Sequence, residues 1–297
     1  MLRENVLAPP ARAPQYGLIV AAPVIDDGAL PTGWAFNPEG CGNSGKLPIL
    51  CAGNTTDMQI GSADGTDWNG DVIEGDAIWI YAEDRCSSMG SRNRDWQGRA
   101  RRQLTAVESY ELADELWSGT VTQAATPDLE NRWLNGPADQ SDTLTSSAVT
   151  PVAGLGCITQ GLAEGLKGQQ GMVHVTPQML QHLAADSIIT KQGNLWVTAM
   201  GHIVVADAGY DGSGPGAVAA GATQWMYGTP MIRVRLGTVE VIPGDLSDAR
   251  NLAIALDWPV NTIAVYAGRL AGYQWDNECV HLAAEISLPI CAVGGAG

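Results

Sequence analysis

The stretch RDWQGRARRQLTAVESYELADELWS, residues 94–118, decides the fold of this chain. It contains no proline and is rich in residues that favour helices, and Gly119 follows it as a suitable C-terminal cap. We therefore predict one long α-helix over residues 94–118. The apolar side chains of this helix form a narrow stripe, which consists of Leu104, Val107, Leu112 and Leu116.

The charges of this helix oppose its dipole, because arginines gather at its start and acidic residues at its end. Such an arrangement indicates an electrostatic contact with a neighbouring chain, with nucleic-acid phosphate as a weaker alternative in an acidic protein. A solvated, charged helix face is the other interpretation, and the sequence leaves it open. The candidate contact residues are Arg92, Arg94, Arg99, Arg101, Arg102, Glu108, Glu111 and Glu115.

The part of the chain before this helix is extended and polar. Residues 1–30 read as a proline-rich arm, in which the apolar run GLIVAAPV at 17–24 predicts a strand interrupted at Pro23. Residues 31–75 are rich in Gly, Asn, Asp and Ser, which predicts a long loop or an extended, projecting hairpin. The β-branched and aromatic segment DAIWIYA at 76–82 predicts the strand that closes this excursion.

The part after the helix is a mixture of helices and short strands. A polar connector is expected over 119–150, and then a glycine-tolerant helix over 152–166. Thr176 and Pro177 supply an N-cap and a first-turn proline for a helix that runs to about Ala185. Strands are expected at 171–175, 188–191, 195–199, 202–206, 231–236, 238–242, 262–267 and 279–288.

Composition limits the classes of function. The chain has 297 residues, 45% of them hydrophobic, which is ample for one large core or two modest ones. It carries 32 acidic against 16 basic residues, which disfavours bulk binding to nucleic acid or an anionic membrane. No apolar run of membrane-spanning or signal-peptide length is seen, so neither insertion nor secretion is expected. The six cysteines are expected to be free thiols, with a local Cys41–Cys51 bridge as the alternative.

Each candidate site has a simpler interpretation. The loop at 65–76 has some spacings of a calcium loop but lacks its first ligand and its final glutamate. GSGPG at 212–216 lacks the following Lys-Ser/Thr of a phosphate loop, so we expect a flexible surface loop. The histidines lack ligand spacing and are expected to pack in the core or at an interface; they are His174, His182, His202 and His281. We therefore expect no catalytic residue, no metal site and no cofactor.

The order of these segments resembles the layout of tailed-phage major capsid proteins. The phrase GMVHVTPQMLQHLAADSIITKQGNLWVTAMGHIVVADAGYDG at 171–212 is similar to the axial-domain strand, helix and hairpin of actinobacteriophage capsid proteins. The runs ATQWMYGTPMIRVRLGTVEVIP and NTIAVYAGRLAGYQWDNECVHLAAEISLP, at 222–243 and 261–289, resemble their closing strands. The resemblance covers residues 94–290 well and residues 1–93 in layout.

This resemblance implies an α+β fold with an N-arm, an extended loop, a spine helix, a peripheral domain and an axial domain. The expected ranges are 1–30 for the N-terminal arm, 31–90 for the extended loop, 91–150 for the spine helix and peripheral domain, 151–245 for the axial domain, and 246–297 for the return strands and tail. No residues of the cross-linking chemistry seen in some family members are carried over, because only Lys46 lies in the loop region.

The function implied is a structural subunit of an icosahedral virion. It would self-assemble into hexamers and pentamers in the host bacterial cytoplasm and enclose double-stranded DNA without sequence-specific contact. A separate scaffold, portal or decoration protein is an implied partner, and a membrane is not. Two alternatives remain: an encapsulin-like nanocompartment shell, and a carbohydrate-binding or carbohydrate-acting β-rich protein suggested by the ten tryptophans.

Overall fold

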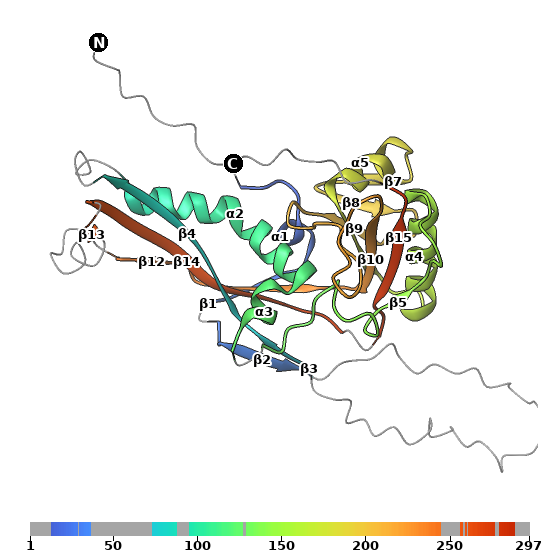
Figure 1. The fold of residues 1–297 in the computed structure, drawn as a ribbon, viewed down its shortest axis with the longest axis horizontal. Helices are drawn as coiled ribbons and strands as arrows, with labels where there is room; N and C mark the ends of the chain where they lie inside the picture. The colour runs from blue at the N-terminus through green and yellow to red at the C-terminus, as the bar shows by residue number, and fades with distance from the viewer. Residues whose placement is uncertain are drawn as a thin grey trace, which may run out of the picture.

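Two large β-sheets joined by one long helix form the body of the molecule (Figure 1). The computed structural model describes residues 13–28, 30–36, 73–87, 95–126, 129–244, 256–257, 259, 261–276 and 279–288. The proline-rich start of the arm, most of the expected extended loop and the calcium-like loop therefore lie outside the described residues, apart from 73–76.

The long helix is α2 (Trp96–Ser118), which confirms the prediction with its start moved by two residues. Asp95 is the N-cap, and its side chain accepts a hydrogen bond from the Gly98 amide at 2.9 Å. Gly119 ends the helix in the left-handed conformation, with a φ of 61°. Asp95 and Gly119 therefore set the two ends of the helix.

The first sheet has six strands, and α2 packs across one of its faces. Strand β4 (Ile78–Ser87) runs antiparallel to β14 (Thr262–Gln274) over ten residue pairs. On the other edge of β14 lie β11 (Arg233–Gly237), β12 (Glu240–Ile242) and β13 (Leu256–Asp257), and β1 (Val24–Gly28) pairs in parallel with β11. The buried side chains under α2 include Ile78, Ile80, Val265 and Ala267.

The second sheet has seven strands of mixed direction. In spatial order they are β5 (Asp142–Thr143), β15 (Leu282–Ile286), β10 (Gln224–Pro230), β6 (Gly171–Val175), β9 (Ile203–Ala206), β8 (Leu195–Thr198) and β7 (Ile189–Gln192). Helices α4 (Pro151–Gly165) and α5 (Pro177–Ala185) cover one face, where they share a core with the sheet (Figure 1). Thr176 caps α5 as predicted, since its side chain accepts from the Met179 amide.

Helix α2 packs against both sheets, because its buried apolar residues belong to one hydrophobic cluster that holds side chains of both sheets. In its first half the buried residues are Trp96, Ala100 and Leu104, and in its second half they are Ser109, Leu112, Ala113, Glu115, Leu116 and Trp117. The helix is therefore enclosed on more of its sides toward its C-terminal end. The Trp117 ring stacks on Tyr210 and on Tyr227 of β10, with centroid distances of 4.7 and 5.0 Å. The predicted apolar stripe is confirmed at Leu104, Leu112 and Leu116, but the buried side is wider than predicted, because it also includes Trp96, Ala100, Ala113 and Trp117.

Three further predictions need correction. The run at 17–24 forms a four-residue helix, α1 (Leu18–Ala21), and the strand β1 begins only after Pro23. The expected connector at 119–150 contains the short helix α3 (Thr120–Ala124). Strand β10 was not predicted, and β14 extends seven residues beyond the expected end at Ala267. None of the described helices is both long and apolar enough to span a membrane.

A separate two-stranded sheet forms the base of a hairpin. Strands β2 (Gly33–Phe36) and β3 (Ile73–Asp76) are antiparallel, and Gly33 pairs with Asp76 at the end nearest the body. This pairing confirms the extended hairpin at its base. Figure 1 shows the two strands beside the six-stranded sheet, on the side opposite to α2.

Candidate functional site

The hairpin base rests on the six-stranded sheet through one aromatic side chain. Trp34 of β2 is only 9% exposed, and its ring covers Gly272 of β14 so closely that a Cβ there would lie 2.0 Å from it. The guanidinium of Arg235 lies 5.7 Å from the centroid of the same ring. A glycine at position 272 is thus required for Trp34 to pack on β14, because any side chain there would displace the indole.

Asp76, the last residue of β3, binds the connector between α3 and β5. Its amide donates to Asn131 Oδ1 at 2.9 Å, and its carboxylate Oδ2 accepts from the Glu130 amide at 3.0 Å. The next amide, of Ala77, donates to the carbonyl of Thr32 at 2.8 Å and closes the base of the hairpin. The end of β3 is therefore fixed by hydrogen bonds on both sides.

The same connector is bound to the C-terminal end of α2. The Asn131 side-chain amide donates to Thr122 Oγ1 at 3.3 Å, and the Thr122 hydroxyl donates to Glu115 Oε1 at 2.5 Å. Glu115 is 1% exposed and also accepts from the amides of Val121 and Thr122, at 2.6 and 2.9 Å. Its carboxylate thus caps the start of α3. We call the four side chains Glu115, Thr122, Asn131 and Asp76 the hairpin relay.

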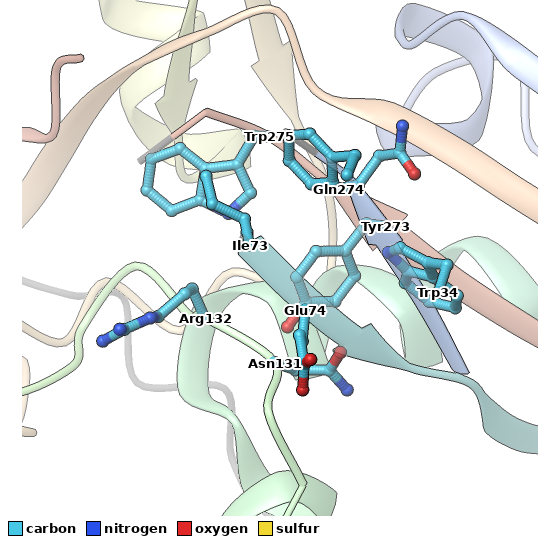
Figure 2. A pocket seen from close by; sticks show the side chains of 9 residues that line it. Trp34, Ile73, Glu74, Asn131, Arg132, Tyr273, Gln274 and Trp275 are labelled. Carbon is cyan, nitrogen blue, oxygen red and sulfur yellow. The ribbon is translucent and has the colours of Figure 1, made fainter. Parts of the chain in front are cut away.

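A small pocket opens at this place (Figure 2). The space in it that the centre of a water-sized sphere can occupy is about 10 Å³, and it is lined by Trp34, Phe36, Ile73, Glu74, Asn131, Arg132, Tyr273, Gln274 and Trp275. Ligand pockets are usually larger, about 300–1,000 Å³. Figure 2 shows the guanidinium of Arg132 directed away from Trp34 and Tyr273. Within the described residues no group of three His, Cys, Asp or Glu side chains could hold a metal ion. This arrangement holds the base of the hairpin against the body.

The contact candidates predicted from the sequence are not equally available to a neighbour. Arg99 pairs with the buried Asp84 at 3.0 Å, and Glu108 pairs with Arg269, whose side chain is 15% exposed. Burial raises the pKa of Glu108 more than Arg269 lowers it. Because Glu115 is also enclosed, three candidates are engaged inside the subunit.

The remaining described candidates are at the surface. Arg102 makes an exposed pair with Asp95 at 3.3 Å, and Arg101 and Glu111 are exposed. Arg92 and Arg94 lie outside the described residues. The described candidates do not form one exposed patch, because Arg99, Glu108 and Glu115 are engaged within the subunit.

Three histidines pack in the core, as expected. His174 lies 3.0 Å from both the Tyr210 hydroxyl and Thr229 Oγ1, and burial lowers its pKa to about 3. Burial also lowers the pKa of His281 to about 4, and His202 is 3% exposed. His182 is exposed on α5, so its expected position at an interface stays a prediction.

Two other expectations are wrong. The GSGPG segment is not a surface loop, because Ser213 is 4% exposed and accepts hydrogen bonds from Trp117 Nε1 and Asn135 Nδ2 at 3.1 and 2.7 Å. Cys279 is disulfide-bonded, whereas Cys157 is a free thiol as expected. The Cys41–Cys51 alternative lies outside the described residues.

Comparison with known proteins identifies the fold of this chain. No protein-family model and no curated protein matches the chain. Among solved structures, the capsid of Ralstonia phage GP4 is similar at a TM-score of 0.54 and 9% identity, over 99% of this chain and 97% of that one. The holo-SrpI encapsulin complex from Synechococcus elongatus PCC 7942 gives 0.53 and 7%, over 97% and 96%. The capsid of an empty GTA particle gives 0.52 and 10%, over 97% and 95%. The chain therefore has the α+β major capsid fold that tailed phages and encapsulins share.

Proposed function

We propose that this chain is the major capsid protein of a tailed double-stranded DNA phage. Copies of it would form hexamers and pentamers that close into an icosahedral head, assembled in the host cytoplasm. The observation that carries the proposal is the likeness of fold to a phage capsid over 99% of the chain. The paired hairpin base formed by β2 and β3 supports the proposal, because a hairpin would give one copy a means to contact another.

The proposed domains follow the two sheets. The peripheral domain would be the six-stranded sheet with α2, and the axial domain the seven-stranded sheet with α4 and α5. This division differs from the sequence ranges 151–245 and 246–297. The difference arises because β11 and β12 pair with β14, whereas β15 pairs with β10.

For contacts with a neighbouring copy we propose the exposed candidates Arg101, Arg102 and Glu111. Arg92 and Arg94 remain proposals for the same role. Packaged DNA would touch the shell without sequence-specific contact, since 32 acidic residues face 16 basic ones. A separate scaffold, portal or decoration protein is proposed as a further partner.

Electron microscopy of the expressed chain tests this function. We expect uniform closed shells with pentameric and hexameric capsomers, and a monodisperse monomer at every concentration would contradict the proposal. Particles recovered from an infected host with double-stranded DNA and a tail are expected for a phage head. Shells that contain protein and no DNA would contradict the phage assignment.

One alternative has a specific observation in its favour. The likeness to an encapsulin, at a TM-score of 0.53, is as good as the likeness to the phage capsid at 0.54, so a cellular compartment shell is the second candidate. The carbohydrate-binding alternative has little support, because four of the described tryptophans are core residues: Trp34, Trp96, Trp117 and Trp275. Trp79 is exposed by itself on β4, without a second exposed tryptophan among the described residues.

A further inference from the structure

We propose that the hairpin relay fixes the angle at which the hairpin leaves the body, and that shell assembly depends on this angle. The proposal rests on the proposed function for its second part only. It names Asp76, Asn131 and Thr122 as positioning residues of the hairpin.

The first step concerns the hairpin base. Trp34 packs on Gly272, and the Ala77 amide donates to the Thr32 carbonyl at the base of the hairpin. The two hydrogen bonds at Asp76 attach the end of β3 to the connector as well, because one uses its backbone amide and the other its side chain. Together they fix both the position and the direction of the end of β3.

The second step concerns Asn131, which is 5% exposed. Its carbonyl oxygen accepts from Asp76, and its amide nitrogen donates to Thr122. Because both ends of one planar amide are occupied, a rotation of Asn131 would break a bond on each side. The orientation of the hairpin is therefore coupled to the position of Thr122.

The third step concerns α2. Thr122 donates to Glu115, and the backbone carbonyl of Glu115 accepts from the Tyr273 hydroxyl at 3.3 Å. Tyr273 follows Gly272 in β14, and Gly272 is the residue on which Trp34 packs. The relay therefore connects β14, through Tyr273 and α2, to a hairpin that packs on the same strand through Trp34.

Amide hydrogen exchange of the unassembled chain tests the positioning role. Asp76→Ala removes the bond from the Glu130 amide, Asn131→Ala removes the bond from the Asp76 amide, and Thr122→Val removes the relay hydroxyl without touching β3. We expect each variant to speed exchange of the Asp76 and Glu130 amides by about tenfold or more, with exchange in α4 unchanged. Asp139→Ala and Asn194→Ala, at exposed positions of the same residue types, are the matched controls and should exchange like the wild type.

A conservative substitution at Asp76 distinguishes a positioning role from an effect on overall stability. Asp76→Asn keeps an oxygen that accepts from Glu130, so it should restore slow exchange where Asp76→Ala does not. Wild-type exchange at both amides in Thr122→Val and Asn131→Ala would overturn the relay.

Shell yield, measured by sedimentation and microscopy, tests the second part. We expect about a tenfold loss of closed shells in Asn131→Ala and Thr122→Val, and recovery in Asp76→Asn. If variants whose Asp76 and Glu130 amides exchange rapidly still form normal shells, assembly does not depend on the angle at which the hairpin leaves the body. A wild-type chain that forms no shells would instead contradict the proposed function, and the exchange experiment would still decide whether the relay positions the hairpin.

Discussion

His281 shows how burial at one residue makes stability depend on pH. Its ring is 7% exposed, donates through Nδ1 to the Gln140 carbonyl at 2.9 Å, and lies 5.0 Å from the Trp275 ring. Burial lowers its pKa to about 4, below the ordinary value of about 6.5. The neutral ring therefore stabilises the fold fully above about pH 6.5, and this stabilisation is lost as the pH falls through about 4.

We predict that the melting temperature of the unassembled chain falls on acidification, and that His281→Gln loses less than the wild type between pH 6.5 and 4. Glutamine can still donate to Gln140, and it cannot take up a proton in this range. Differential scanning calorimetry at several pH values is the measurement. His182→Gln, at an exposed position, should follow the wild-type curve. Parallel curves for His281→Gln and the wild type would show that this imidazole is not responsible.

At the scale of elements, α4 approaches the seven-stranded sheet through its glycines. A Cβ on Gly161 would lie 2.7 Å from Leu282 Cδ1, whereas a Cβ on Gly156 would have nothing within 4 Å. The two positions therefore form a matched pair within one helix. Their helix propensities are equal, and only their surroundings differ.

We predict that Gly156→Ala stabilises the protein by about 0.5–1 kcal/mol, because alanine favours the helix and meets no obstacle. Gly161→Ala should gain less or lose stability, because Leu282 must move in a packed core. Urea denaturation of both variants measures the difference. An equal gain from the two substitutions would mean that α4 does not lie closely against β15.

The elements that the sequence predicted are those with local signals. Asp95 and Gly119 cap the two ends of α2, and Thr176 and Pro177 begin α5. Each of these residues is adjacent in sequence to the helix that it begins or ends. Strand β10 was missed because Gly228 and Pro230 interrupt its apolar pattern, although it is central in its sheet.

Elements and contacts that depend on residues far apart in the sequence could not be predicted. The Leu18 amide at the start of α1 donates to Asp207 at 2.9 Å, across 189 residues of sequence. The hairpin relay joins Asp76 to Asn131, which are 55 residues apart, and neither residue has a neighbour in sequence that indicates the contact. Of the candidate site, the sequence predicted that a hairpin exists and missed the side chains that hold it.

At the scale of the whole molecule, the net charge of −16 opposes the approach of identical copies. Salt weakens this repulsion, since the screening length falls from about 10 Å at 0.1 M to about 3 Å at 1 M. We predict that the yield of shells rises with sodium chloride over this range. Light scattering measures the yield, and sucrose at equal osmolality is the control. A yield that falls with salt would indicate that attractive ion pairs, such as those proposed for Arg101 and Arg102, dominate assembly.

The packing of α2 against both sheets also limits how the subunit can deform. Leu104 and Trp117 belong to one hydrophobic cluster that holds residues of both sheets, so a change in the angle between the sheets would have to separate Trp117 from Tyr210 and Tyr227. Each copy is therefore expected to behave as one rigid body, in which α2 links the two sheets. In the proposed closed surface, which needs both flat and sharply curved regions, we expect the required bending to occur at the contacts between subunits.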